Sequence, residues 1–174
     1  MSPNFKSYNK VTVAFYKGGN SLIHKIIKWW TKSEYSHAEL ILPDGVTWIS
    51  ISPFLNSKVT PKIKLKPVSQ EDWEFIDLQF SHREAVRLYQ IVQLYRFIEE
   101  TQFSRYDWIG MLLSQCSPFI VKNRTKWYCS EWIAYALLHS RILTWDEVKI
   151  YSTPDMSPNK LYNLVKGYTP KHYK

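Results

Sequence analysis

The sequence predicts an α+β protein, because most strand patterns lie in its first half and most helix patterns lie in its second half. β-Branched and aromatic runs, several alternating with polar residues, dominate up to about residue 80. Beyond that point, apolar residues recur at helical spacing between capping and stop signals. We therefore expect an antiparallel sheet packed against helices.

Five segments have the composition and alternation typical of strands: residues 11–17, 36–42, 46–52, 58–67 and 73–80. The second and third flank Asp44-Gly45, a strong signal for a tight hairpin turn. In the fourth, Lys62, Lys64 and Lys66 fall on one face. Such a lysine face is typical of an edge strand, because it discourages pairing with another chain.

Five helices are expected at residues 20–31, 81–100, 106–114, 127–138 and 157–167. Asn20 can cap the first, Ser81 and Glu84 form a capping box for the second, and Ser157-Pro158 opens the last. The first helix is amphipathic, and we expect its apolar stripe to pack on the core and its basic side to face water. The stripe contains Leu22, Ile23, Ile26, Ile27 and Trp30, and the basic side contains His24, Lys25 and Lys28.

The length and composition suit one domain spanning residues 1–174, with a short basic tail from about residue 168. Two cysteines cannot form a disulfide framework, and no apolar run is long enough to span a membrane. Residues 1–10 are polar and lack the apolar stretch of a signal peptide, so we expect a cytoplasmic protein.

The excess of positive charge indicates which kinds of partner the protein could bind. With 23 Lys+Arg against 15 Asp+Glu, the net charge is +8, which favours an anionic polymer, an anionic membrane or nucleic acid. Lys62, Lys64 and Lys66 are the candidate patch for nucleic acid. The alternative is that the charge mainly supports solubility.

Cys129 is the first candidate for chemistry, because it falls in the first turn of a predicted helix. There, unpaired N–H groups and the helix dipole favour a thiolate, the reactive form of cysteine. The alternative is a structural role, since free cysteine is among the most buried residue types.

His37 is the second candidate. It lies on a predicted strand, and Glu39, two residues on, faces the same side. A carboxylate beside an imidazole can hold the ring in one tautomer and stabilise its charged form, as a Cys–His pair requires. The alternative is an exposed His–Glu pair on a wet face of the sheet.

The other titratable residues suggest no further chemistry. His24, His82, His139 and His172 lack partners at metal-ligand spacing, and we expect them to be solvated or to cap helices. A zinc site formed by Cys116, Cys129 and His37 is the weakest alternative. We expect no metal and no cofactor.

Three motifs in order resemble circularly permuted papain-like enzymes of the NlpC type, the YiiX-like group. The first is T-x-S-x-Y-S-H, formed by Thr31, Ser33, Tyr35, Ser36 and His37. The second pairs Y-D-x-x-G at residues 106–110 with C-S-E at residues 129–131, and the third is S-P-x-x-L at residues 157–161. Together they touch about half of the chain.

The resemblance implies a permuted papain-like fold in which Cys129 is the nucleophile and His37 the base. Family members commonly take a polar orienting residue, often a carboxylate, from the strand after the histidine, but residues 48–52 contain no acid. Glu39 is the favoured substitute, and Ser50 or Ser52 is the alternative. Tyr16 is a candidate oxyanion donor, and Tyr35, Trp127 and Tyr128 are candidates for lining a substrate pocket.

Three functions follow, in order of preference. The first is a cysteine hydrolase that cleaves an amide bond, with a bacterial cell-wall peptide favoured because the wall polymer is anionic. The second is a lipid-directed acyltransferase or thiol esterase at an anionic membrane, by similarity to the lecithin retinol acyltransferase-like group. The third is a catalytically degenerate binding protein for nucleic acid or another protein. The first fits a phage-encoded protein, carried in the virion or released at lysis.

Overall fold

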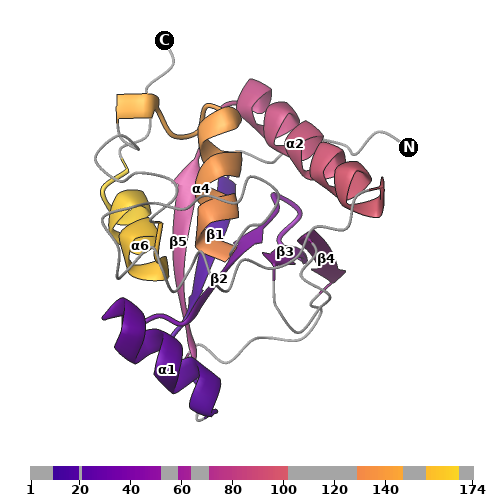
Figure 1. The fold of residues 1–174 in the computed structure, drawn as a ribbon. Coiled ribbons are helices and arrows are strands. Elements are labelled where there is room, and N and C mark those ends of the chain that lie inside the picture. Colours follow the sequence, from indigo (N-terminus) through magenta and orange to yellow (C-terminus); the bar gives the residue numbers. More distant parts are fainter. Residues whose placement is uncertain are drawn as a thin grey trace.

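The computed structural model describes residues 10–19, 21–51, 59–63, 71–101, 129–146 and 156–168 of the 174-residue chain (Figure 1). Several predictions lie outside these ranges and are not tested by the structure. They are the helix at 106–114, the tail beyond residue 168, Lys64 and Lys66 of the candidate nucleic-acid patch, and Ser52, Cys116, Trp127, Tyr128 and His172.

The described strands form one five-stranded sheet: β1 (Lys10–Tyr16), β2 (His37–Ile41), β3 (Thr47–Ile51), β4 (Val59–Ile63) and β5 (Trp73–Gln79). Their order across the sheet is β4-β3-β2-β1-β5, and every neighbouring pair is antiparallel. The predicted α+β class with an antiparallel sheet is therefore confirmed. β4 is an edge strand and contains Pro61, a residue that sheets tolerate at an edge because it cannot donate a hydrogen bond.

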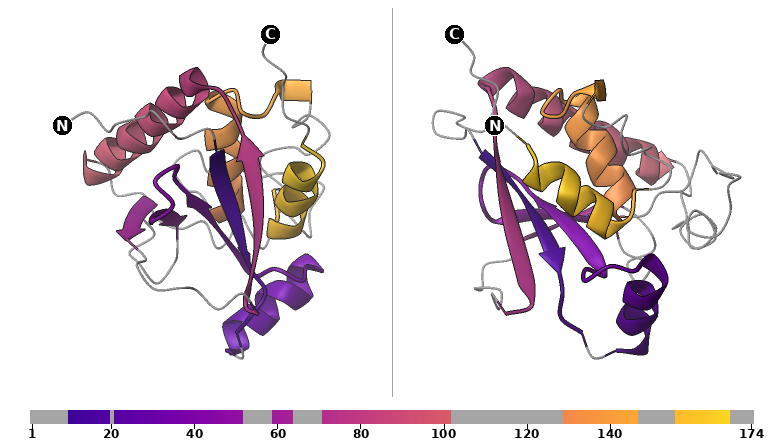
Figure 2. Two further views of the ribbon diagram at one scale, coloured as in Figure 1. Left: turned by 180° about the vertical axis from the view of Figure 1, so that it is seen from behind. Right: turned by 90° about the vertical axis from the view of Figure 1, so that its left-hand side faces the viewer.

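Four helices accompany the sheet: α1 (Leu22–Thr31), α2 (His82–Thr101), α4 (Cys129–His139) and α6 (Pro158–Lys166). The two views of Figure 2 show α2, α4 and α6 together on one side of the sheet, with α1 apart from them. Apolar residues that alternate along the strands face these three helices. This core includes Val11, Val13, Phe15, Leu40, Ile49, Leu78, Leu88, Trp132, Leu137 and Leu161.

Side-chain caps fix two of the helix starts as predicted. The Ser81 N–H donates to Glu84 Oε2 at 2.7 Å, which is one half of a capping box. Ser157 caps α6, Pro158 follows it, and Gly167 ends the helix. The cap of α1 is a correction, because Ser21 Oγ, and not Asn20, accepts the hydrogen bond from the His24 N–H.

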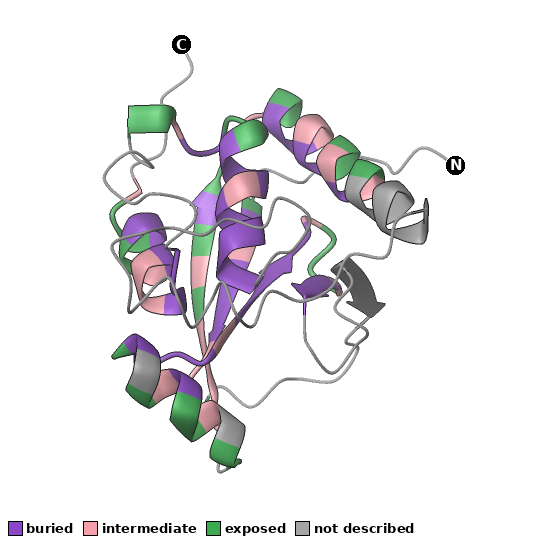
Figure 3. Ribbon diagram, in the orientation of Figure 1, coloured by how far each residue is buried: buried purple, intermediate pink, exposed green. Residues whose placement is uncertain are grey.

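The orientation of α1 is a second correction. Ile27 is buried against the body of the protein, as predicted, but Leu22 and Ile26 of the same predicted stripe are exposed. Figure 3 shows exposed residues recurring along the outer side of this helix. Of the predicted stripe, Ile27 packs on the core as expected and Leu22 and Ile26 do not, while the side chains of Ile23 and Trp30 lie outside the description.

Among the helices that the structure describes, none is both long enough and apolar enough to cross a membrane.

Candidate active site

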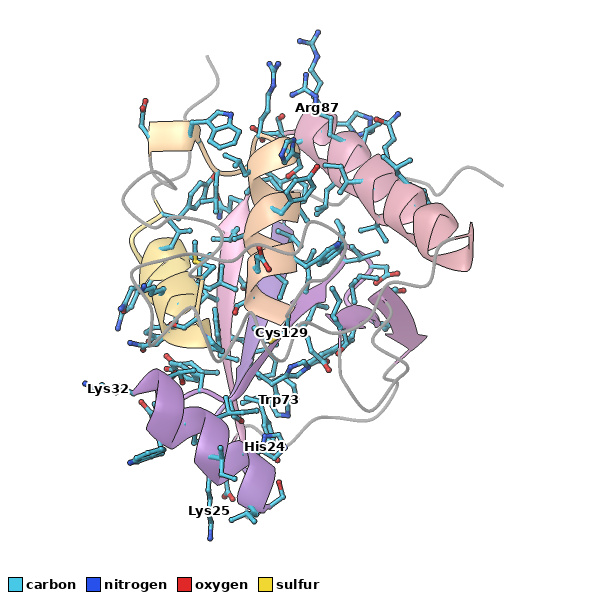
Figure 4. The ribbon with its side chains drawn as sticks, in the orientation of Figure 1. His24, Lys25, Lys32, Trp73, Arg87 and Cys129 are labelled. Atoms are coloured by element: carbon cyan, nitrogen blue, oxygen red, sulfur yellow. The ribbon has the colours of Figure 1, made fainter. Side chains whose placement is uncertain are left out.

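Cys129 is the first residue of α4 as described, and Figure 4 shows it at the end of this helix that points toward α1. Only 4% of the residue is exposed. Its sulfur accepts hydrogen bonds from the backbone N–H groups of Ser130 and Ala38. The first donor belongs to the open turn of the helix and the second to β2, so both elements hold the sulfur in place.

His37 opens β2 and is hydrogen-bonded to Cys129. Its Nε2 atom lies 3.1 Å from Ser50 Oγ and 3.4 Å from Glu39 Oε1. Because Nε2 is directed toward these two oxygens, Nδ1 is the ring nitrogen left for the sulfur. The structure thus brings together Cys129, His37, Glu39 and Ser50, four of the residues singled out in the sequence.

The pleat of the sheet explains why three of these side chains meet. β2 and β3 pair through Leu40–Ile49 and Ile41–Trp48, and Leu40 and Ile49 face the core. Alternation then places Glu39 and Ser50 on the opposite face. His37, two residues before Glu39, shares that face, so the site is built at one end of β2, where the α4 terminus reaches it.

The charges of Cys129 and His37 stabilise each other. Burial alone would lower the pKa of His37, but the Cys129 thiolate and the Glu39 carboxylate outweigh it and raise the pKa to about 9. Burial opposes ionisation of Cys129, but the His37 imidazolium and the two backbone N–H groups hold the pKa of this thiol below its usual range. Each charge therefore stabilises the other, and the Cys129–His37 pair is shifted toward its thiolate–imidazolium form.

Glu39 is only 4% exposed and Ser50 is buried as well. A buried carboxylate is costly unless a partner of opposite charge or a hydrogen-bond donor compensates for its lost hydration. The His37 ring, whose side chain is 17% exposed, is such a partner. Both residues that the sequence left open for the orienting role, Glu39 and Ser50, contact the same ring nitrogen of His37.

An aromatic group lies beside the site, and sequence reasoning missed part of it. Tyr16 is opposite His37 on β1 and opposite Trp73 on β5. Its ring lies 4.9 Å from Trp73 and 5.1 Å from His24, measured between ring centroids. This places the Tyr16 side chain, the candidate oxyanion donor, next to the histidine.

His24 is a correction. It was expected to be solvated or to cap a helix, but it is partly buried and its Nδ1 lies 2.8 Å from Ser36 Oγ. Burial, together with the positive charges of His37 and Lys28, lowers the pKa of His24. The helical stripe gave no hint of this, because the contact depends on how α1 folds back onto the turn before β2. By contrast, His82 and His139 are exposed, as expected.

Tyr35 is also a correction, because it does not line an exposed pocket. It is buried in the core, where its ring packs against Phe15 and Tyr162. Its hydroxyl donates to Glu74 Oε2 at 2.5 Å, and the Tyr162 hydroxyl donates to the other oxygen of the same carboxylate. This partly buried cluster ties the segment just before His37 to β5 and α6.

The remaining candidates, Ser52, Trp127 and Tyr128, lie outside the described residues, as does Cys116 of the alternative zinc site. Within the described ranges, no group of three or more His, Cys, Asp or Glu side chains is arranged to hold a metal ion. The chemistry that the site can perform with its own residues is that of a nucleophilic thiolate beside a proton donor.

Comparison of the chain with family models, with curated proteins and with solved structures gave no significant match. The likeness to permuted NlpC-type enzymes therefore rests on the sequence motifs.

Proposed function

We propose that this protein is a cysteine hydrolase with a permuted papain-like fold and that Cys129 and His37 are its catalytic pair. The hydrogen bond between these two residues, at the start of α4, is the observation that supports the proposal most directly. Nucleophile and base must come within hydrogen-bond reach of each other, and a third group must orient the base. Glu39 and Ser50 are the candidates for that third group, because both contact Nε2 of His37.

The reaction would proceed in two acyl-transfer steps. The Cys129 thiolate attacks the substrate carbonyl carbon, and backbone N–H groups at the start of α4 stabilise the negative charge that develops on the oxygen. The His37 imidazolium then donates its proton to the leaving group, and a thioester remains on Cys129. Neutral His37 next takes a proton from water, which attacks the thioester and releases the acid.

An amide bond in a bacterial cell-wall peptide is the substrate we favour. The resemblance to NlpC-type enzymes supports this class, and the net charge of +8 suits an anionic polymer. The measurement is release of new amino groups from purified cell wall by the protein and by its Cys129→Ala variant. Release that persists in the variant would rule out the mechanism.

The reactivity of the thiol can be tested before any substrate is known. We expect iodoacetamide to label Cys129 at pH 7 about tenfold faster, or more, than in a His37→Ala variant, because the imidazolium stabilises the thiolate. Rates are followed by mass spectrometry in a Cys116→Ser background, so that one thiol is counted.

His24→Ala is the matched control for this experiment. It removes a second imidazole from the same side of the molecule, but one that bonds Ser36 and not the sulfur. Labelling should be nearly unchanged in this variant. Equal rates in the unsubstituted protein and the His37→Ala variant would mean that the histidine does not activate the thiol.

One observation favours the second candidate function, acyl transfer or hydrolysis on a lipid. Apolar side chains of α1 are exposed on the helix that also supplies His24 to the edge of the site. The same catalytic pair would serve, because a thioester is also the intermediate of acyl transfer.

A further inference from the structure

The outward side of α1 is apolar. Leu22 is 72% exposed, Ile26 is 46% exposed and Trp29 is 75% exposed. Their spacing of four and three residues places them on one face of the helix, one above the other. We call these three residues the α1 stripe. A contiguous apolar face on the surface of a protein is typical of an interaction site, whereas isolated apolar side chains are not.

The opposite side of α1 is anchored to the body of the protein. Ile27 and Thr31 are buried there, and His24 is hydrogen-bonded to Ser36 Oγ at 2.8 Å. On the same side, the Lys28 ammonium donates to the backbone carbonyl of Lys17. Turning the α1 stripe inward would break these contacts, so its exposure is built into the way the helix is attached.

Positive charge borders the α1 stripe. Lys25 and Lys32 are both exposed, and Figure 4 shows their side chains projecting away from the body of the protein, while His24 points toward Trp73 and Cys129. The helix, LIHKIIKWWT, contains no acidic residue. A partner for this face should therefore be apolar where it meets the α1 stripe and anionic beside it.

We propose that the α1 stripe docks on the surface of an anionic lipid bilayer, with α1 lying in the plane of the interface. Leu22 and Ile26 would enter the boundary of the acyl chains, Trp29 would sit at the level of the headgroups, and the two lysines would contact anionic headgroups. Ten residues of helix are roughly 15 Å long, about half the thickness of the hydrocarbon core, so α1 lies on the bilayer and does not span it.

Charge separates this partner from a second copy of the chain. A symmetric dimer through the α1 stripe would bring the same lysine-bordered surface of both copies together, and like charges facing each other are destabilising. An anionic bilayer has the complementary charge. The proposal is independent of the proposed hydrolase, because docking uses no atom of Cys129 or His37.

Vesicle sedimentation tests the docking. Full-length protein is mixed with vesicles of neutral phosphatidylcholine, alone or with about one third phosphatidylserine, at about 50 mM salt. We expect binding to the anionic vesicles that weakens as salt is raised. Absence of binding to anionic vesicles at low salt would overturn the proposal.

The apolar contribution to docking is tested by the double variant Leu22→Ser with Trp29→Ser. This variant should partition from water onto the anionic vesicles about tenfold or more weakly than the unsubstituted protein. The matched control is Leu94→Ser with Trp145→Ser, which removes the same two residue types from other surfaces, where they are 54% and 66% exposed. This control should bind as the unsubstituted protein does. Equal loss in both pairs would overturn the role of the α1 stripe.

The electrostatic contribution to docking is tested by the double variant Lys25→Gln with Lys32→Gln. This variant should bind anionic vesicles about fivefold to thirtyfold more weakly. The control, Arg83→Gln with Arg87→Gln, removes the same net charge from α2, and Figure 4 shows Arg87 projecting from the end of the molecule away from α1. If both pairs weaken binding equally, net charge alone accounts for it and the docking face is wrong.

Two further measurements separate the outcomes. Cys129→Ala should bind vesicles as the unsubstituted protein does. Loss of the hydrolase proposal would therefore leave the docking proposal standing, and loss of the docking proposal would leave the hydrolase proposal standing. Sedimentation velocity without lipid should show the same species before and after Leu22→Ser with Trp29→Ser. A dimer that this double substitution dissolves would identify a second copy, and not a bilayer, as the occupant.

Discussion

The two faces of the sheet differ in the side chains that they bury, although each buries apolar residues, with a small cluster of Ala14, Ile41 and Trp48 on the face of His37. On one face, Val13, Phe15 and Leu40 pack beneath α4 in a continuous apolar core. On the other face, His37 and Glu39 share the strand β2 with Leu40 but contact polar partners. Neighbouring residues of the same strand therefore face opposite sides of the sheet, one the apolar core and the other the candidate active site.

The difference lies in what each face tolerates. An apolar core depends on volume, and its stability falls when a side chain is truncated. The site face buries a carboxylate next to a histidine, and its state depends on which groups carry charge. Substitutions that change volume and substitutions that change charge should therefore separate the two faces in experiments.

The largest effect on stability is expected on the core face. Leu137→Ala removes a fully buried side chain of α4 and should lower the free energy of unfolding by about 2–5 kcal/mol, measured by urea denaturation. Iodoacetamide labelling of Cys129 in the folded protein should change little, because the substitution leaves the charges of the site in place.

Leu94→Ala is the control, since it makes the same chemical change at an exposed position of α2. It should alter the free energy of unfolding by no more than about 0.5 kcal/mol. If Leu137→Ala slowed labelling as strongly as His37→Ala, the two faces would be coupled and the separation proposed above would be wrong.

An intermediate effect is expected at Glu39. Glu39→Gln keeps the shape of the side chain but removes the charge beside His37, so the pKa of His37 should fall from about 9 by roughly one unit or more. An NMR titration of the His37 ring measures this shift directly, and at neutral pH it also reports how much of the ring remains charged.

Ser50→Ala is the comparison for Glu39, because it removes the other contact of the same nitrogen without changing any charge. Its effect on the His37 midpoint should be smaller. A larger shift in Ser50→Ala than in Glu39→Gln would make the hydroxyl the principal positioning group and the carboxylate secondary.

Much of the local structure could be predicted, because its causes are local in the sequence. The strand β1 and the turn at Asp44-Gly45 follow from residue type and alternation, and Gly45 has the positive φ of 72° that favours glycine. The start of α6 follows from Ser157 and Pro158. His37 and Glu39 were placed on one face by the strand period alone.

The contacts between elements could not be predicted, because they depend on how the elements pack. The helices α1 and α6 illustrate this. Both are short and amphipathic, yet α6 buries Leu161 and Leu164 while α1 exposes Leu22 and Trp29. Periodicity indicates that a helix has an apolar side, but it does not say what that side contacts. The position of His24 was missed for the same reason.

The smallest effect is expected at His24, whose pKa shift is opposite to that of His37. Burial and the charges of His37 and Lys28 lower the pKa of His24, and His37 stays protonated throughout the range in which His24 titrates. Removing a positive charge makes protonation easier, so His37→Gln should raise the His24 midpoint by a few tenths of a unit and Lys28→Gln by less. His139 is an internal control in the same NMR titration, because burial alone lowers its pKa and neither substitution should move it. A His24 midpoint that stays fixed in both variants would mean that burial accounts for the whole shift and that the two histidines of this face titrate independently.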